Sequence, residues 1–362
     1  MKNKRVTIFI GSLSGGGAER VACNLANYLS RRQYYIDVVT MSDTKASYGL
    51  NENVKEIALL SDKEKTNKIK DNIVRNERLK KYIKENQDVS CYIVMLPITI
   101  FMLARLRRMI PGKTIIAERC NPDSYSLLVK MMMRYAAKRC DLLVVQTKEI
   151  GNWYKDVKNK IIIPNAINKD VVMPERREVL KKIVAVGRLT KQKNYPMLIK
   201  GFYEFQKKHP EYILEIYGQG KEKEELERLV REYGISKKVK FLGYVSNVSE
   251  RIADAKCFVM TSNYEGMPNA LIEAMCMGLP CIATDCDGGG AKALILNDKN
   301  GVLIPKNDVD ELVGKMNRIV EDDDFAKKIA ENAKELKNQL SYDKIYAEWE
   351  KAIANNEGIK NG

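Results

Sequence analysis

Short apolar runs alternate with stretches of helical periodicity along most of the 362 residues. Residues 6–10 form the first apolar run, apolar side chains then repeat at helical spacing over residues 21–29, and residues 36–40 form the next run. Strand, helix and strand in this order predict two parallel strands joined by a crossover helix. Because the pattern recurs in both halves of the chain, it predicts α/β domains with parallel sheets, whose ligands lie at the carboxyl ends of the strands.

The chain is long for a single hydrophobic core, and two domains of ordinary size fit its length better. We expect an N-terminal domain over residues 1–168, a C-terminal domain over residues 169–345, and a last helix at 346–362 that returns to the first domain. Further strands are predicted at residues 89–96, 114–117, 142–146, 161–164, 182–186, 213–217, 239–242 and 279–284. Helices are predicted at residues 63–84, 98–109, 125–138, 196–207 and 222–233.

Residues 262–280 are the most informative stretch for function, because two glutamates flank a predicted helix start there. Pro268 suits the first helical position and Gly278 suits the residue after the last, so the stretch is predicted to be a loop, a short helix and a strand. Glu265 then lies in the loop, and Glu273 lies more than one turn inside the helix. These two carboxylates can bind hydroxyls of a sugar nucleotide; the alternative is that both are ordinary solvated glutamates.

The start of the same helix is predicted to bind an anion. Backbone N–H groups in the first turn have no helical acceptor, and the helix dipole adds positive potential, which suits a diphosphate. The N–H groups expected to contribute are those of Met267, Asn269 and Ala270, and Pro268, which has no N–H, lies among them in the predicted donor-binding segment.

A glycine-rich loop follows the first predicted strand and opens the first helix. Its small residues, with Gly16 and Gly17 among them, would let a substrate approach the backbone closely. The loop has neither the dinucleotide spacing G-x-G-x-x-G nor a Walker lysine, so a simple tight turn is the alternative. Glu19 and Arg20 follow it and are expected to lie near the ligand or to pair with each other.

Arg188 and Lys193 lie five positions apart around the end of a predicted strand. Together they can bring two positive charges to a diphosphate that gains negative charge as a bond to it breaks, so no metal ion is needed. Ordinary surface charge is the alternative. Asp285 and Asp287 spell a D-x-D metal motif, but they follow a strand and precede three glycines, and we interpret them as part of a loop.

Four ordered segments, residues 8–20, 184–194, 216–220 and 262–292, resemble motifs of the retaining glycosyltransferases of family four. The resemblance covers essentially the whole chain. It implies the GT-B fold, with two Rossmann-like parallel-sheet domains facing each other across a cleft. It also implies that Glu273 binds the ribose, that Glu265 binds the transferred sugar, and that Gly218 allows close packing near the base. Arg188, Lys193 and the helix start would then hold the diphosphate, with the glycine loop against it, and the sugar would be transferred with retention and without an enzymic nucleophile.

One segment departs from the family pattern. Many members carry a histidine after the strand that ends at Ala117, whereas this chain has Arg119 there, within a segment similar to that of a subgroup making bacterial exopolysaccharides and lipid-linked saccharides. An arginine can stabilise a phosphate but cannot act as a general base. The neighbouring Glu118 and Asn121, together with Glu19 and Arg20, are assigned to the acceptor side.

The excess of positive over negative charge lies almost entirely in the first half of the chain. Residues 1–170 carry 31 Lys and Arg against 17 Asp and Glu, whereas residues 171–362 carry 31 against 30. This asymmetry favours an extended anionic partner, such as a lipid diphosphate acceptor or an acidic membrane surface, over a merely solvated basic face. The predicted helices at 100–110 and 125–138 combine apolar side chains with Lys and Arg, as interfacial helices do.

The sequence therefore predicts a glycosyltransferase that extends a lipid-linked or polysaccharide acceptor in bacterial cell-surface glycan synthesis from a nucleotide sugar, taken to be a UDP-sugar. No metal and no other cofactor is expected. Eight cysteines without C-x-x-C pairs and the lack of a long apolar run predict a cytoplasmic protein. The basic first half and its two basic helices predict that it binds the inner face of the membrane peripherally. A sugar-nucleotide epimerase of the same fold is one alternative. A basic nucleic-acid-binding protein is another, but no binding motif and few aromatic residues support it, so no nucleic acid partner is expected.

Overall fold

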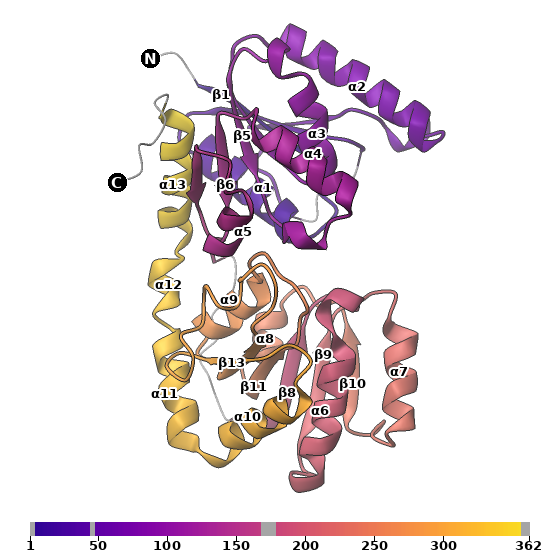
Figure 1. Cartoon of the computed structure of the whole chain (residues 1–362), viewed down its shortest axis with the longest axis vertical. Coiled ribbons are helices and arrows are strands. Elements are labelled where there is room, and N and C mark those ends of the chain that lie inside the picture. Colours follow the sequence, from indigo (N-terminus) through magenta and orange to yellow (C-terminus); the bar gives the residue numbers. More distant parts are fainter. Residues whose placement is uncertain (1–3, 44–47, 168–178, 356–362) are drawn as a thin grey trace. The chain divides into compact units, whose positions relative to one another are not determined.

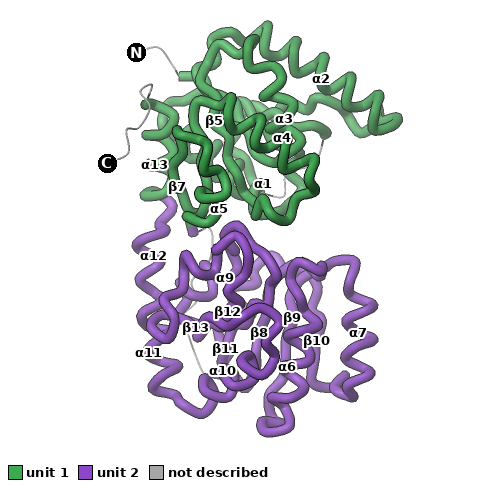
Figure 2. The backbone as a smooth tube through the Cα atoms, viewed as in Figure 1, with its two compact units in different colours: residues 1–166, 343–362 green, residues 167–342 purple. Residues whose placement is uncertain are grey.

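A computed structural model describes residues 4–43, 48–167 and 179–355 and divides the chain into two compact units (Figure 2). Unit 1 comprises residues 1–166 together with residues 343–362, and unit 2 comprises residues 167–342. The last helix of the chain therefore belongs to unit 1, although it follows unit 2 in the sequence (Figure 1).

Unit 1 is built on a seven-stranded parallel sheet in the order β3-β2-β1-β4-β5-β6-β7. Its strands are β1 Arg5–Ile10, β2 Tyr35–Thr40, β3 Val54–Ala58, β4 Val89–Met95, β5 Lys113–Ala117, β6 Leu142–Val145 and β7 Lys160–Ile162. Its helices are α1 Gly17–Ser30, α2 Lys68–Glu85, α3 Pro97–Arg105, α4 Leu127–Ala137, α5 Lys148–Trp153 and α13 Tyr342–Ala354, with short 3-10 turns at Asp62–Glu64, Arg107–Met109 and Pro122–Ser124. The central strands are almost wholly buried, as expected when helices cover both faces of a parallel sheet.

Unit 2 is built on a six-stranded parallel sheet in the order β10-β9-β8-β11-β12-β13. Its strands are β8 Leu180–Val186, β9 Ile213–Tyr217, β10 Val239–Gly243, β11 Ala255–Met260, β12 Cys281–Thr284 and β13 Val302–Ile304. Its helices are α6 Tyr195–Lys208, α7 Lys223–Glu232, α8 Val248–Ile252, α9 Asn269–Cys276, α10 Val309–Glu321, α11 Asp323–Ala333 and α12 Leu336–Gln339, with a 3-10 turn at Lys191–Lys193. One apolar core joins the sheet to α6, α7, α10 and α11.

The predicted fold class is confirmed, since both units are Rossmann-like parallel α/β domains. Several element boundaries were predicted incorrectly. The charged helix expected from residue 63 begins at Lys68, because the Asn67 side chain caps it by accepting a hydrogen bond from Lys70 N at 3.0 Å. The basic helix expected over 98–109 ends at Arg105 and continues only as a 3-10 turn. The strands β3, β11 and β13 were not predicted.

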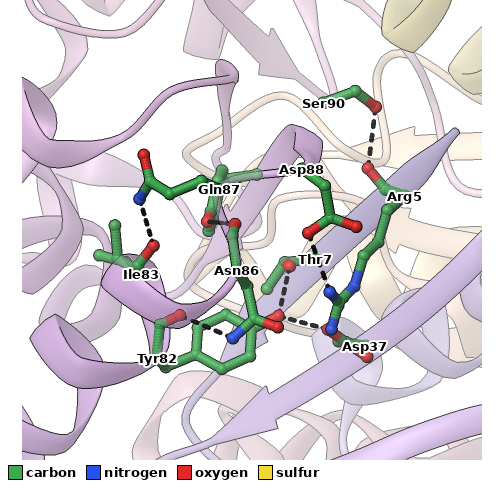
Figure 3. Close-up of polar contacts among 10 residues, drawn as sticks. Arg5, Thr7, Asp37, Tyr82, Ile83, Asn86, Gln87, Asp88 and Ser90 are labelled. Atoms are coloured by element: carbon green, nitrogen blue, oxygen red, sulfur yellow. Dashed lines mark hydrogen bonds and ion pairs between the residues drawn. The ribbon is translucent and has the colours of Figure 1, made fainter.

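A buried polar network ties α2 to β1 and β2 (Figure 3). The Asp37 carboxylate, 4% exposed, accepts hydrogen bonds from Arg5 Nη2 at 2.6 Å and from the Tyr82 hydroxyl at 2.5 Å, and Thr7 Oγ1 lies 2.7 Å from the same hydroxyl. Asp37 and Thr7 lie in the first halves of their strands, away from the carboxyl ends. We therefore interpret this network as structural.

The two basic helices proposed to meet a membrane differ in exposure. Apolar residues of α3 such as Ile100 and Leu103 are buried in the core, and Arg107 in the turn after it is paired with Asp141 at 2.9 Å. The apolar stripe of α4 is exposed instead: Leu127 75%, Leu128 67%, Met131 62% and Tyr135 40%. Among the described residues, no helix is long and apolar enough to cross a membrane.

Candidate active site

Three loops meet at the carboxyl edge of the unit 2 sheet, because β8, β11 and β12 are adjacent strands. The loop after β8 is joined to the loop after β11 through Gln192, whose side chain donates to Tyr264 O at 2.9 Å and whose carbonyl accepts from Asn263 N at 2.8 Å. Thr261 Oγ1 also donates to Lys193 O at 3.1 Å. These bonds fix the two loops against each other, so the side chains that they carry are held in place before any ligand arrives.

Glu265 and Lys193 are brought into direct contact by this arrangement. Lys193 Nζ lies 2.5 Å from Glu265 Oε1, and Ser262 Oγ donates to the same oxygen at 2.8 Å. Both side chains of the ion pair are mostly buried, 15% exposed for Lys193 and 10% for Glu265. Sequence reasoning treated the two as separate ligands, for the diphosphate and for the sugar, and it missed Ser262, three residues before the glutamate.

Arg188 lies two residues past the end of β8, and its side chain is exposed. Among the described residues it forms no ion pair. Lys193 is paired with Glu265, so Arg188 is the cation of this motif that has no carboxylate partner among the described residues.

Helix α9 begins at Asn269, one residue later than predicted. Pro268 is the cap residue, with extended backbone angles of φ −78° and ψ 107°, and its carbonyl accepts the first helical bond from Ile272 N at 3.1 Å. Gly278 follows the last turn with φ 74°, as expected. Glu273 lies in α9 and is 8% exposed, so it is not the ordinary surface glutamate of the alternative interpretation.

The first residues around this helix start differ in exposure. Met267 and Pro268 are buried, whereas Asn269 and Ala270 are half-buried at the edge where the loops meet. Gly290, in the glycine segment after β12, packs against the backbone just before α9: a methyl group on Gly290 would lie 2.3 Å from Gly266 O. A side chain at position 290 would therefore push the α9 start out of place.

The turns after β8 and β9 are packed backbone against backbone. Gly218 has φ 147°, and a methyl group there would lie only 1.9 Å from Gly187 O. Gly218 N donates to Gly243 O at 2.7 Å, which adds the end of β10 to the same turn. Only glycine fits this position, which agrees with the close packing expected there.

The D-x-D carboxylates are each paired with a lysine. Asp285 lies 3.3 Å from Lys292 Nζ and Asp287 lies 2.6 Å from Lys306 Nζ. Asp287 O also accepts from Glu265 N at 2.9 Å, so this segment helps to place Glu265. Within the described ranges, no three His, Cys, Asp or Glu side chains cluster so as to hold a metal ion.

In unit 1 the glycine loop joins β1 to α1. Gly15 has φ 105°, Gly16 precedes the helix, and Gly17 is its first residue. The Glu19 carboxylate folds back over the loop, since a methyl group on Gly16 would lie 2.4 Å from Glu19 Oε2. Arg20 N donates to Gly16 O at 3.1 Å and starts the helical bonding.

The segment after β5 is buried. Glu118, 1% exposed, accepts hydrogen bonds from the backbone N–H groups of Arg119 and Cys120 and from the hydroxyls of Tyr125 and Tyr154, the latter at 2.6 Å. Burial raises the pKa of the Glu118 carboxyl, and these four hydrogen bonds oppose the rise. The Asn121 side chain caps the next turn through Asp123 N at 3.1 Å. Glu118 and Asn121 thus hold this loop together.

Arg119 is also buried, 8% exposed, and its guanidinium lies 5.0 Å from the ring centre of Trp349 on α13. Arg119 Nη1 donates to Asn165 Oδ1 at 3.3 Å, and burial lowers the pKa of Arg119 to about 10. Sequence reasoning missed Asn165 and Gln146, although Gln146 ends one predicted strand and Asn165 directly follows another, where site residues of parallel sheets gather.

Residues 169–336 match the family model described as glycosyl transferases group 1. An uncharacterized glycosyltransferase of Methanocaldococcus jannaschii is 30% identical over 273 residues, which cover 63% of this chain and 67% of that protein. The chain belongs to the group 1 glycosyltransferases. It is also 29% identical, over 91% of its length and 94% of the relative, to the N-acetylgalactosamine-N,N'-diacetylbacillosaminyl-diphospho-undecaprenol 4-alpha-N-acetylgalactosaminyltransferase of Campylobacter jejuni.

Solved structures agree on the fold of this group 1 glycosyltransferase. Sucrose-phosphate synthase from Thermosynechococcus elongatus superposes with a TM-score of 0.84 at 17% identity, over 97% of this chain and 98% of that one. HepE of Anabaena, in complex with UDP and glucose, superposes with a TM-score of 0.83 at 16% identity, over 97% of this chain and 100% of that one. The expected GT-B fold is therefore confirmed.

Proposed function

We propose that this group 1 glycosyltransferase moves a sugar from a UDP-sugar, with retention and without a metal ion, to a saccharide carried on a lipid diphosphate or a growing polysaccharide. The observation that carries the proposal is the buried Lys193–Glu265–Ser262 group beside the start of α9. The Campylobacter jejuni relative, named for a diphospho-undecaprenol acceptor, supports the acceptor class.

The donor would be bound at the carboxyl edge of unit 2. Arg188 and the half-buried start of α9 bind the diphosphate, because an exposed guanidinium and the positive end of a helix both favour anions. Glu273 accepts from the ribose hydroxyls and Glu265 from a hydroxyl of the sugar. Gly218 keeps the turn beside the base thin enough for close approach.

Charge on the diphosphate grows as the bond to the sugar breaks, so cations near it lower the barrier more than they tighten binding. Arg188 and Lys193 supply these cations. Glu265 holds Lys193 in position, and its second carboxylate oxygen is not used by the Lys193 and Ser262 donors.

The acceptor would be bound in unit 1, at the loops after β1 and β5. Glu19 and Arg20 lie at the start of α1, and Glu118, Arg119 and Asn121 lie after β5. Because Glu118 and Asn121 are engaged in holding their own loop, we assign them to shaping this side, and we assign Arg119 to an anionic group of the acceptor.

The lipid-linked acceptor would be reached at an anionic membrane surface through α4. Its exposed apolar stripe of Leu127, Leu128 and Met131 is accompanied by Lys130 and Arg134. Apolar side chains beside basic ones suit the boundary between headgroups and acyl chains.

A transfer assay tests the proposal. Purified protein is incubated with labelled UDP-sugars and a short diphosphate-linked saccharide, and the product's anomeric configuration is determined by NMR. Glu265→Gln should abolish transfer, while the matched exposed change Glu250→Gln in the same unit should leave it unchanged. Equal activity of Glu265→Gln and wild type, or inversion in the product, would refute the proposed site.

A further inference from the structure

Three polar side chains follow three neighbouring strands of unit 1 and gather under the C-terminal helix. Arg119 lies two residues after β5, Gln146 directly after β6 and Asn165 three residues after β7, and these strands are adjacent in the sheet. All three side chains are buried, with exposed fractions of 8%, 2% and 3% respectively. Carboxyl ends of parallel strands are where Rossmann-like domains bind ligands, and the proposed function uses only the first of these residues.

The hydrogen bonds of the cluster leave one side of the arginine unused. Asn165 Oδ1 accepts from Gln146 Nε2 at 2.7 Å and from Arg119 Nη1 at 3.3 Å. Arg119 Nε and Nη2 are buried and have no hydrogen-bond partner among the described residues, and neither does Gln146 Oε1. Nε and Nη2 form one edge of the planar guanidinium, and their N–H bonds point in the same direction. This edge is the one that receives two oxygens of a single carboxylate or phosphate.

Among the described residues of unit 1, no carboxylate occupies that edge. Glu118, the adjacent acid, accepts from two backbone N–H groups and two tyrosine hydroxyls. Burying a charge without a directly paired anion is strongly unfavourable. The stacking of the guanidinium on Trp349 and the attraction to the nearby Glu118 offset only part of this cost, so the protein alone leaves the charge incompletely compensated.

Helix α13 closes the cluster. Trp349 is 0% exposed and Tyr346 is 1% exposed, and the Trp349 ring lies against the guanidinium at 5.0 Å. A ligand can reach Nε and Nη2 only if this part of α13 or the loop after β5 moves. Binding must therefore change the surroundings of Trp349.

We propose that Arg119, Gln146 and Asn165 form a diphosphate-binding site in unit 1 that α13 covers with Trp349. Two phosphate oxygens accept from Arg119 Nε and Nη2, while Asn165 holds Nη1 and so fixes the plane of the guanidinium. The inference rests on the proposed function for the source of the ligand, which is the diphosphate of the acceptor or a free diphosphate.

Tryptophan fluorescence of the full chain tests the site without any turnover. The chain has two tryptophans, so Trp153→Phe leaves Trp349 as the sole emitter. Inorganic pyrophosphate should change the Trp349 emission saturably at constant ionic strength. Adding Arg119→Gln should raise the half-saturating concentration by about tenfold or more, because a bond to a charged group is lost from each of two nitrogens. Arg31→Gln, the matched loss of an exposed arginine in unit 1, should not change it.

Geranyl diphosphate identifies the source of the ligand. Half-saturation at lower concentration than pyrophosphate indicates the lipid-linked acceptor, and equal concentrations indicate a free diphosphate; both support the site. No emission change with pyrophosphate, or an equal change in Arg119→Gln, would overturn it. A Trp349 response to UDP but not to pyrophosphate would also overturn the site, since it would report only donor binding in unit 2.

Two further readouts keep the test decisive. If Arg119→Gln does not fold, Arg119→Lys, which keeps the charge but lacks the two-nitrogen edge, should show the same weakened response. Hydrogen exchange over residues 342–354 should accelerate when pyrophosphate binds, and unchanged exchange would contradict movement of α13. If the transfer assay fails but the Trp349 fluorescence still responds to pyrophosphate, the proposed donor chemistry is refuted and this site stands. If transfer occurs but the fluorescence does not respond, only this site is refuted.

Discussion

Replacing Gly218 with alanine tests whether backbone packing at the ends of β8 and β9 builds the donor site. The new methyl group would lie 1.9 Å from Gly187 O, whereas real side-chain contacts of this kind begin near 3.0 Å. The two turns must therefore separate by roughly 1 Å, a distance at which hydrogen bonds and van der Waals contacts are both lost. Since Gly187 directly precedes Arg188, this separation displaces the residue expected to bind the diphosphate.

The free energy of unfolding lost in Gly218→Ala has two parts. Alanine at φ 147° adopts a backbone conformation that costs roughly 1–3 kcal/mol, and the overpacked contact adds about 1–3 kcal/mol more. In a domain of this size each kcal/mol lowers the melting temperature by roughly 2–4 °C. We therefore expect the unit 2 transition to fall by at least about 5 °C.

Gly234→Ala is the matched control. Gly234 also has a positive φ, 68°, but a methyl group there would meet nothing within 4 Å. Its substitution should cost only the backbone strain of about 1–2 kcal/mol. Differential scanning calorimetry measures both transitions, and titration calorimetry with a UDP-sugar well below them measures donor affinity. If the two variants lose equal stability, or if Gly218→Ala binds the donor like wild type, the packing argument is wrong.

Four further outcomes are expected. Glu273→Ala should weaken donor binding by about 1–3 kcal/mol in titration calorimetry, because the ribose loses its acceptor, and unchanged affinity would remove it from the site. Arg188→Ala and Lys193→Ala should lower kcat more than donor affinity, and EDTA should leave wild-type activity intact; dependence on added manganese would instead restore the D-x-D aspartates as metal ligands. Burial raises the pKa of the thiols of Cys23, Cys91, Cys276 and Cys286 to about 12, whereas a thiol in the unfolded chain titrates at about 8.5. The stability that these protonated thiols contribute is therefore complete below about pH 8.5 and is lost as the pH rises above it. The melting temperature should fall from pH 8 to 10, and a flat melting temperature over this range would contradict the argument. Lys130→Glu with Arg134→Glu should release the protein from phosphatidylglycerol liposomes at low salt while sparing activity on a soluble acceptor, and unchanged sedimentation would exclude α4 as the contact.

The period of the apolar pattern was enough to predict both sheets, because buried parallel strands appear as short apolar runs. It missed β11, it missed β13, which has only three residues, and it missed β3, which is not apolar throughout. β3, with the sequence VKEIA, lies at the sheet edge and exposes its charged residues, so it has no strong strand signal. Helix starts were misplaced where a capping side chain or a proline cap decided the boundary, as at Asn67 and Pro268.

The positions of candidate site residues could be predicted where they follow a strand end or lie in a short helix with clear end signals, as Arg188 and Glu273 do. What the sequence could not provide is contact between distant segments. Lys193 and Glu265 are 72 positions apart, and only the adjacency of β8 and β11 brings their loops together. The packing of Trp349 against Arg119 joins the C-terminal helix to the loop after β5 in the same way, and no local sequence pattern predicts it.

The pairing of Lys193 with Glu265 also changes how the site handles charge. A lone buried carboxylate beside a diphosphate would repel it, and desolvation would make that repulsion stronger than in water. With Lys193 at 2.5 Å the carboxylate is neutralised, and the exposed Arg188 and the start of α9 then give this edge a net positive character. An anionic nucleotide sugar can thus approach. One oxygen of the Glu265 carboxylate is oriented by the hydrogen bonds from Lys193 and Ser262, and neither of these groups bonds to the other oxygen. Because Ser262 and Lys193 hold the same oxygen, the protein sets the direction of the carboxylate, and a sugar hydroxyl bound to it as proposed would be placed by the protein and not by the substrate.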